Sequence, residues 1–97
     1  MLTSRADVGT EHASRYLQQL CKHWAHKFAV EFDPAHGSIE LPAGKAVLDA
    51  DAAALHIVVN AQDDSGLERL EKVVEDHIRR FAFREELAFH WSRQPGV

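Results

Sequence analysis

The stretch LHIVVNA at residues 55–61 decides the fold, because every second side chain in it, from Leu55 to Ala61, is apolar. This alternation predicts a β-strand with one buried face. A slip of one residue in its pairing would turn all of these side chains toward solvent, so the register of the strand is strongly specified. We therefore place a strand over residues 55–61 and assign the rest of the chain outward from it.

A helix is predicted soon after this strand. Ser65 and Glu68 have the spacing of a capping box, in which the serine hydroxyl and the glutamate carboxylate each accept a hydrogen bond from a backbone amide that the first helical turn leaves free. The pattern predicts that the helix begins at Ser65 and continues to Phe81. Its apolar stripe comprises Leu67, Leu70, Val73, Val74, Ile78 and Phe81.

Both ends of the chain carry shorter strand patterns. Residues 87–91 alternate apolar and polar side chains and predict a last strand, followed by a frayed tail over 93–97. Residues 2–8 alternate in the same way and predict a strand suited to a sheet edge.

A second helix is predicted after this first strand. A break in the pattern follows residue 8, and Thr10 is the expected N-cap of a helix that continues to Phe28. The apolar stripe of this helix is Ala13, Leu17, Leu20, Cys21, Trp24 and Phe28.

The middle of the chain predicts three further strands. Residues 30–32 and 38–41 alternate on either side of a turn at 33–37, which predicts a β-hairpin, and residues 45–49 continue as a short strand. The order of elements is then βαββββαβ. We expect an α+β two-layer sandwich, in which two helices cover one face of a mainly antiparallel sheet and leave the other face open to solvent or a partner. The predicted core is Leu17, Leu20, Trp24, Phe28, Ile57, Val59, Val74, Ile78, Phe81, Phe89 and Trp91.

Length, composition and charge exclude several classes of protein. A chain of 97 residues, with 45% hydrophobic and 27% charged residues, suits a single small domain over 1–97. A net charge of −4 has the wrong sign for binding nucleic acid, and no apolar run is long enough to span a membrane. The chain opens without a signal-peptide pattern, and its one cysteine, Cys21, has no intramolecular partner, so we expect a cytoplasmic protein.

The candidate ligand-binding site lies where the two helices are expected to meet. Tyr16, His23 and Lys27 recur along one shoulder of the first helix, at the border of its apolar stripe. The second helix carries a shoulder of its own, and a histidine inside its apolar stripe whose ring needs a hydrogen-bond partner. If the shoulders face each other, their guanidinium groups suit a small anionic ligand or an acidic protein segment. The residues of the second helix are Asp76, His77, Arg80 and Arg84.

The same residues also admit a purely structural interpretation. Ion-pair networks are a common use of mixed charge between helices. In that interpretation Asp76 neutralises Arg80, and Glu85 and Glu86 neutralise Arg84.

Metal binding and nucleophilic catalysis find little support in the sequence. His23 and His26 are neighbours on the first helix, but two ligands do not complete a zinc site, and Cys21 projects toward the core. The chain contains no zinc-binding, phosphate-loop or nucleophile-elbow motif. We therefore assign no catalytic residue, no metal ligand and no cofactor.

Two blocks of the sequence resemble a known bacterial family. The first comprises RYL at 15–17, LCKHWAHK at 20–27 and VEF at 30–32, and the second comprises DH at 76–77 and RFAFREEL at 80–87. They resemble the bacterial domain-of-unknown-function family 2218 over nearly the whole chain. Members look like small stand-alone proteins, and similar domains occur attached to siderophore-interacting flavoproteins. The resemblance implies a loose connection with iron uptake and supplies no catalytic residues.

The sequence therefore favours a non-catalytic binding or accessory module, linked through its family to iron and siderophore handling. Two alternatives remain open. One is a small histidine-dependent enzyme or metal-binding protein that uses His23, His26 and His77. The other is a structural homodimer formed through the open sheet face.

Overall fold

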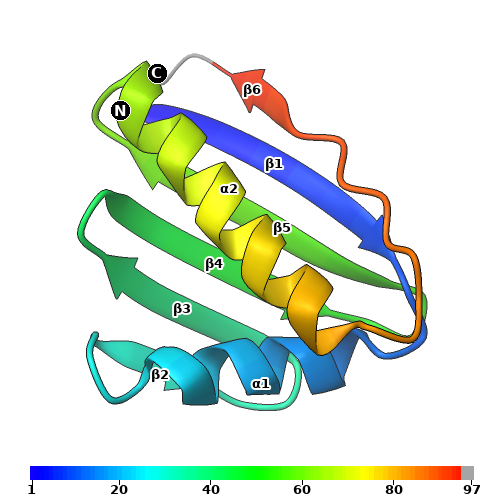
Figure 1. Cartoon of the computed structure of the whole chain (residues 1–97). Helices are drawn as coiled ribbons and strands as arrows, with labels where there is room; N and C mark the ends of the chain where they lie inside the picture. Colours follow the sequence, from blue (N-terminus) through cyan, green and yellow to red (C-terminus); the bar gives the residue numbers. More distant parts are fainter. Residues whose placement is uncertain (95–97) are drawn as a thin grey trace.

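The computed structural model describes residues 1–94. Within them, six strands form one antiparallel sheet and two helices pack on one of its faces, which confirms the predicted α+β two-layer sandwich (Figure 1). Neither of these helices combines the length and the apolar character that crossing a membrane requires. The elements are β1 (Leu2–Gly9), α1 (Ala13–Trp24), β2 (Val30–Phe32), β3 (His36–Leu41), β4 (Gly44–Ala50), β5 (Ala54–Ala61), α2 (Asp64–Phe81) and β6 (Ser92–Gln94).

β5, the strand with the clearest sequence pattern, lies inside the sheet. The strand order is β2-β3-β4-β5-β1-β6, so β5 pairs with β4 on one side and with β1 on the other. In the β1–β5 ladder Leu2 pairs with Ala61, and Gly9 with Ala54. The expectation that β1 sits at an edge is wrong, because β6 returns along β1 and covers it. The edges are β2 and β6, both only three residues long, and short edge strands limit unwanted pairing.

The core lies between the sheet and the two helices. β5 directs Leu55, Ile57 and Val59 toward the helices, and all three are fully buried. α1 lies mainly over β3 and β4, and α2 lies over β5, β1 and β4. Figure 1 shows α2 crossing in front of the sheet. Among the predicted core residues, the buried ones are Leu17, Leu20, Trp24, Ile57, Val59, Val74 and Ile78, whereas Phe28, Phe81, Phe89 and Trp91 are partly buried and pack against this cluster.

α2 begins one residue before the predicted start. Its N-cap is Asp63, whose carboxylate accepts a hydrogen bond from the amide of Gly66 at 2.7 Å. Ser65 is therefore not the N-cap, and Glu68 lies too far into the helix to complete a capping box. The reason is that β5 ends at Ala61 and an aspartate, which caps a helix as well as serine does, follows almost at once.

α1 is shorter than predicted at both ends. Its N-cap is His12 rather than Thr10, and the Thr10 hydroxyl instead accepts a hydrogen bond from the amide of His12 at 3.0 Å. At the other end the helix stops at Trp24, and the amides of Lys27 and Phe28 both donate to the Trp24 carbonyl. The backbone there loosens into turns, and Phe28 is partly buried beyond the helix itself.

The segment 87–91 forms no strand, so the last predicted strand was placed too early in the chain. Instead, the segment packs along α2 and forms hydrogen bonds with it. Arg79 of α2 donates to a backbone carbonyl of the segment at 3.0 Å, and the Trp91 indole donates to Glu75 of α2 at 2.9 Å. Its apolar alternation therefore reflects packing along a helix. β6 follows directly and takes in the first two residues of the predicted tail, whose other residues lie outside the described part of the chain.

Candidate ligand site between the helices

The seam between α1 and α2 contains the candidate site. Tyr16, in the first half of α1, contacts Glu85 beyond the end of α2, whereas His23, near the end of α1, lies against His77 in α2. The two helices therefore run in roughly opposite directions. A cavity of about 400 Å³ opens at the His23 end, and we call it the basic cavity. Its lining residues are His23, Trp24, His26, Lys27, Phe28 and His77.

His77 is held in place by its own helix. Its Nδ1 donates a hydrogen bond to the carbonyl oxygen of Val73 at 2.7 Å, which confirms that the half-buried ring has a partner. This bond leaves Nε2 available for another group. The His77 ring centroid lies 5.0 Å from that of His23 and 4.9 Å from that of Trp24. The imidazole is therefore fixed between the aromatic rings of α1 and its own backbone.

The basic cavity groups four basic side chains, one lysine and three histidines. Loss of hydration lowers the pKa of His23 below its ordinary value of 6.5, and neighbouring cations lower it further. Within the described residues, no carboxylate lines the cavity. In a chain whose net charge is −4, Lys27 and the cavity's histidines in their protonated form give a local excess of positive charge that attracts anions. The neighbours that act on His23 are, in decreasing order, His77, Lys27, Arg80 and His26.

Tyr16 and Arg84, which we expected beside His23, line a second cavity at the other end of the seam. This tyrosine cavity measures about 550 Å³. The Tyr16 hydroxyl donates to the Glu85 carboxylate, and the Thr10 hydroxyl donates to the same carboxylate at 3.0 Å. Burial, followed by the hydrogen bond to Glu85, raises the pKa of Tyr16 to about 12, so the phenol stays protonated. The other lining residues are His12, Arg15, Gln19, Phe81, Phe83 and Glu85.

Asp76 lies away from the seam. Its carboxylate pairs with Lys72 at 3.6 Å, and it lines a hollow that includes Trp91, on the flank of α2 next to the C-terminal segment. The predicted ion pair of Asp76 with Arg80 is therefore wrong. Glu85 does not take the predicted role of neutralising Arg84, because its carboxylate accepts hydrogen bonds from the hydroxyl groups of Tyr16 and Thr10.

The basic cavity holds three histidines, but their arrangement does not suit a metal. Across residues 1–94, no group of three or more His, Cys, Asp or Glu side chains is placed to hold a metal ion. Cys21 is fully buried, and burial raises the pKa of its thiol to about 11. A protonated, enclosed thiol is unreactive. What the cavity offers is ring nitrogens, an ammonium group and aromatic faces, which suit the binding of an anion.

A third cavity adjoins the basic one and is not visible in the sequence pattern. This apolar cavity measures about 290 Å³ and lies where the end of α1, the β3–β4 turn and α2 meet. Trp24 and Phe28 line both cavities. Helical periodicity assigns these two rings to the core, and it cannot show that they also form a cavity wall. The lining residues are Trp24, Phe28, Leu41, Pro42, Ala43, Arg69, Leu70 and Val73.

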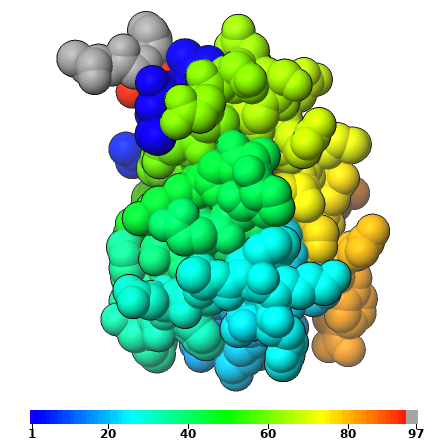
Figure 2. Space-filling view, turned by 90° about the vertical axis from the view of Figure 1, so that its left-hand side faces the viewer, coloured from blue at the N-terminus to red at the C-terminus, as the bar shows by residue number. Residues whose placement is uncertain are grey.

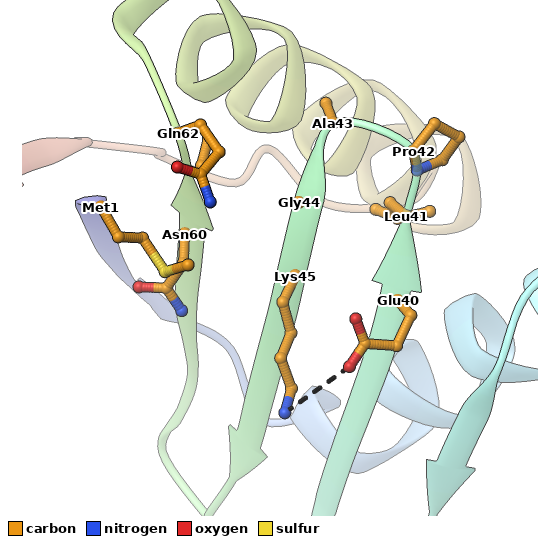
Figure 3. A pocket seen from close by; sticks show the side chains of 10 residues that line it. Met1, Glu40, Leu41, Pro42, Ala43, Gly44, Lys45, Asn60 and Gln62 are labelled. Atoms are coloured by element: carbon orange, nitrogen blue, oxygen red, sulfur yellow. Dashed lines mark ion pairs between the residues drawn. The ribbon is translucent and has the colours of Figure 1, made fainter.

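A further hollow lies at the ends of β3, β4 and β5 and measures about 310 Å³ (Figure 3). Its side chains include both signs of charge. The Lys45 ammonium lies 3.8 Å from the Glu40 carboxylate, and the two side chains point toward each other in Figure 3. Because this lysine is paired, the hollow does not share the charge excess of the basic cavity.

The open face of the sheet carries a row of paired histidines and aspartates that the sequence analysis overlooked. The register aligns Asp7, His56, Asp49 and His36 across four strands. His56 Nδ1 lies 2.6 Å from the Asp7 carboxylate, and His56 Nε2 lies 2.8 Å from that of Asp51. The hydrogen bonds to Asp7 and then Asp51 raise the pKa of His56. His36 Nδ1 pairs with Asp49 at 2.6 Å, so each histidine of the row has a carboxylate partner.

The fold and the seam define a class of protein: a small α+β sandwich whose two helices flank a basic cavity. The chain belongs to the DUF2218 family, described as an uncharacterized protein conserved in bacteria, whose sequence profile matches residues 5–92. The predicted family resemblance is thereby confirmed. The chain is similar to PA4090 from Pseudomonas aeruginosa, solved by NMR, with a TM-score of 0.81 and 38% identity over 95% of this chain and 96% of that one. None of the curated proteins matches it.

Proposed function

We propose that the protein is a non-catalytic binding module that holds a small anion in the basic cavity. One observation carries this proposal: His23, Lys27 and His77 line one cavity, and no carboxylate is among its described lining residues. Arg80 adds positive charge nearby. Neighbouring cations that lack a counter-charge destabilise one another, and an anion from outside the chain relieves that repulsion.

The donors of the cavity suit an oxyanion. The Lys27 ammonium offers three N–H donors, and a protonated imidazole donates from both of its nitrogens. Loss of hydration, and then the neighbouring cations, lower the pKa of His23. A bound anion favours the charged form of this imidazole, so binding is coupled to proton uptake. We therefore expect anion affinity to rise as the pH falls from about 8 to about 6, the range in which histidine titrates.

Sulfate is a suitable probe, because its charge stays constant over this range of pH. A titration followed by the backbone amide signals in NMR should saturate and should move the signals of the basic cavity. Lys27→Ala should weaken sulfate binding by about tenfold, the loss of one charged hydrogen bond. Lys22→Ala is the matched control, because Lys22 is an exposed lysine of α1 that does not line the cavity. Equal losses in the two variants, or shifts that never saturate, would refute the proposal.

A second pair of variants separates the two ends of the seam. Arg80 contributes to the charge around His23, whereas Arg84 lines the tyrosine cavity. Arg80→Ala should weaken sulfate binding, and Arg84→Ala should leave it unchanged. A loss confined to Arg84→Ala would assign the anion to the tyrosine cavity and overturn the proposal as stated.

We also propose a link to iron handling in the cytoplasm, which rests on the resemblance to domains attached to siderophore-interacting flavoproteins. Many ferric chelates are built from carboxylate-type oxygens and carry negative charge, which is the class of ligand that the basic cavity suits. Titration with ferric citrate and with citrate alone tests this link. We expect the iron complex to bind more tightly than citrate in a manner that depends on Lys27, and equal affinities would contradict the link.

The homodimer through the open sheet face stays a prediction. Val47 pairs with Val58 at the centre of that face, and both are half-buried. Sedimentation velocity of the wild type and of Val58→Lys tests it, because a lysine placed in a dry interface would dissociate the dimer. A monomer in both samples would exclude this dimer at the concentration used.

A further inference from the structure

The basic cavity and the apolar cavity share a wall. Trp24 and Phe28 line both, and their rings meet edge to face with centroids 6.4 Å apart. Along α2, Val73 belongs to the apolar cavity and His77, one helical turn later, to the basic one. Figure 2 shows the cyan end of α1 and its following turn against the green β3–β4 region and the yellow part of α2. The two cavities are therefore neighbours along one seam.

The apolar cavity has a lining unlike that of the basic cavity. Aliphatic side chains and the two shared rings form most of it, and Arg69 is its charged residue. Its volume of about 290 Å³ accommodates on the order of ten groups the size of a water molecule or a methylene, at roughly 30 Å³ each. Ligand sites typically combine such an apolar surface with a few polar groups that fix orientation.

We infer that the ligand of this site is a free amphipathic anion: a carboxylate whose head lies in the basic cavity and whose apolar tail passes the Trp24–Phe28 wall into the apolar cavity. This inference rests on the proposed function, because it needs the basic cavity to hold the negative group. A simple inorganic anion leaves the apolar cavity filled with water, whereas a tail removes apolar surface from water on both partners. The negative net charge of the chain opposes adsorption to an anionic membrane and favours a free molecule over a lipid in a bilayer.

Acetate and octanoate are the probes, because they share a head group and differ only in the tail. In a Trp91→Phe background Trp24 is the single tryptophan, so its fluorescence reports on the shared wall. Complete burial strengthens binding by about fourfold per methylene. We expect octanoate to bind at least tenfold more tightly than acetate and to change the emission of Trp24. A ratio below tenfold would overturn the inference.

Two variants locate the tail. Ala43→Phe fills the apolar cavity and should bring octanoate affinity down to that of acetate while leaving sulfate binding unchanged. If that variant fails to fold, Ala43→Leu replaces it, with a smaller loss. Phe83→Ala is the matched control, because Phe83 is a 77% exposed ring outside both cavities and should leave octanoate affinity unchanged. A loss in Phe83→Ala with none at Ala43 would place the tail on the exposed ring and overturn the inference.

Further measurements distinguish a failure of this inference from a failure of the proposed function. If sulfate binds in a Lys27-dependent manner but octanoate gains nothing over acetate, only the amphipathic ligand fails. If octanol binds as tightly as octanoate and Lys27→Ala has no effect on either, the basic cavity holds no head group and both proposals fail. Retention of the protein on phosphatidylglycerol vesicles in co-sedimentation would contradict the free ligand, since we expect the protein to remain in the supernatant.

Discussion

His56 on the open sheet face and His23 in the helix seam belong to the same small sandwich, yet their pKa values move in opposite directions. Asp7 and Asp51 accept hydrogen bonds from the two ring nitrogens of His56 and raise its pKa. Loss of hydration and neighbouring cations lower the pKa of His23. The open face therefore stabilises the charged imidazole, and the seam stabilises the neutral one.

The difference distinguishes two uses of charge. Each histidine of the row on the open face has its carboxylate within the chain, so that surface is balanced without a partner. The basic cavity gathers histidines and Lys27 with no carboxylate in its described lining, so its balance depends on a group from outside. The sequence alone does not distinguish the two surfaces, because each contributes some of the seven histidines and their partners are not visible in it.

The largest effect that we expect concerns the wall of the seam. Trp24 is 5% exposed and contacts both Phe28 and His77. Trp24→Ala should lower the free energy of unfolding by about 3–5 kcal/mol, because it removes a large buried ring and leaves a cavity. Urea unfolding followed by circular dichroism measures this loss. The counterpart on the open face, Val58→Ala, removes a half-buried side chain and should cost less, and a greater loss at Val58 would contradict the comparison.

The two histidines should give opposite dependences of stability on pH. His56 has a raised pKa, so its contribution is fully present below the unfolded value of about 6.5 and is lost as the pH rises through its folded pKa. His23 has a lowered pKa, so the folded state is favoured above that value and is penalised as the pH falls below it. His56→Gln should therefore destabilise more at about pH 5.5 than at about pH 8, and His23→Gln should show the reverse.

Urea midpoints of the two variants and the wild type at both pH values measure this difference. The pH of these measurements must stay above the range in which the carboxylates of the open face titrate. The pKa values of Asp7 and Asp51 are lowered, so the stability that these carboxylates contribute is lost as the pH falls through those values. A dependence of the same sign in both variants would show that the two regions do not differ as described.

A titration with zinc tests whether the histidines of the seam bind a metal ion. Because no group of ligands in the described residues is arranged for a metal, we expect calorimetric titration with zinc to show no tight one-to-one site. The double variant His23→Ala/His26→Ala should give the same titration as the wild type. A strong site that disappears in the double variant would contradict this expectation and favour the alternative of a histidine-based metal protein.

The smallest effect concerns Asp76, which the sequence analysis assigned to the site. Its only ion pair within residues 1–94 is with Lys72, on the exposed side of α2. Asp76→Asn should leave sulfate affinity unchanged and should change stability by no more than about 0.5 kcal/mol. A clear gain in sulfate affinity would show that Asp76 repels the anion from close by, and would place it in the site after all.

Local patterns predicted most of the fold. The alternation in residues 55–61 and the apolar stripes of both helices identify their elements, because burial of one face imposes those periods. The exact ends were less predictable: Asp63 and Ser65 are both good caps, and only the end of β5 decides between them. The pattern at 87–91 was misleading, since a segment packed along a helix also needs an apolar side.

The candidate site was only partly predictable, because it depends on how elements distant in sequence are placed. Helical spacing groups His23 with Lys27, and the structure places His77, also a predicted site residue, beside them across the seam. Asp76 and His77 differ by about 100° around α2, and only the position of the helix on the sheet decides which of them faces α1. The row on the open face needed the strand order, because Asp7 meets His56 only where β1 lies beside β5.

The pairing of Leu2 with Ala61 also affects when the sheet can form during synthesis of the chain. The ribosome makes β1 before the two strands that flank it: β5 is not complete until Ala61 has been added, and β6 comes only at residues 92–94. Until then the hydrogen-bonding edges of β1 lack their native partners, and unpaired edges of nascent chains are exposed to wrong pairing. The β2–β3–β4 hairpins, with their short loops, are free to form earlier. Although β1 is made before the rest of this sheet, it is therefore among the last strands to be enclosed.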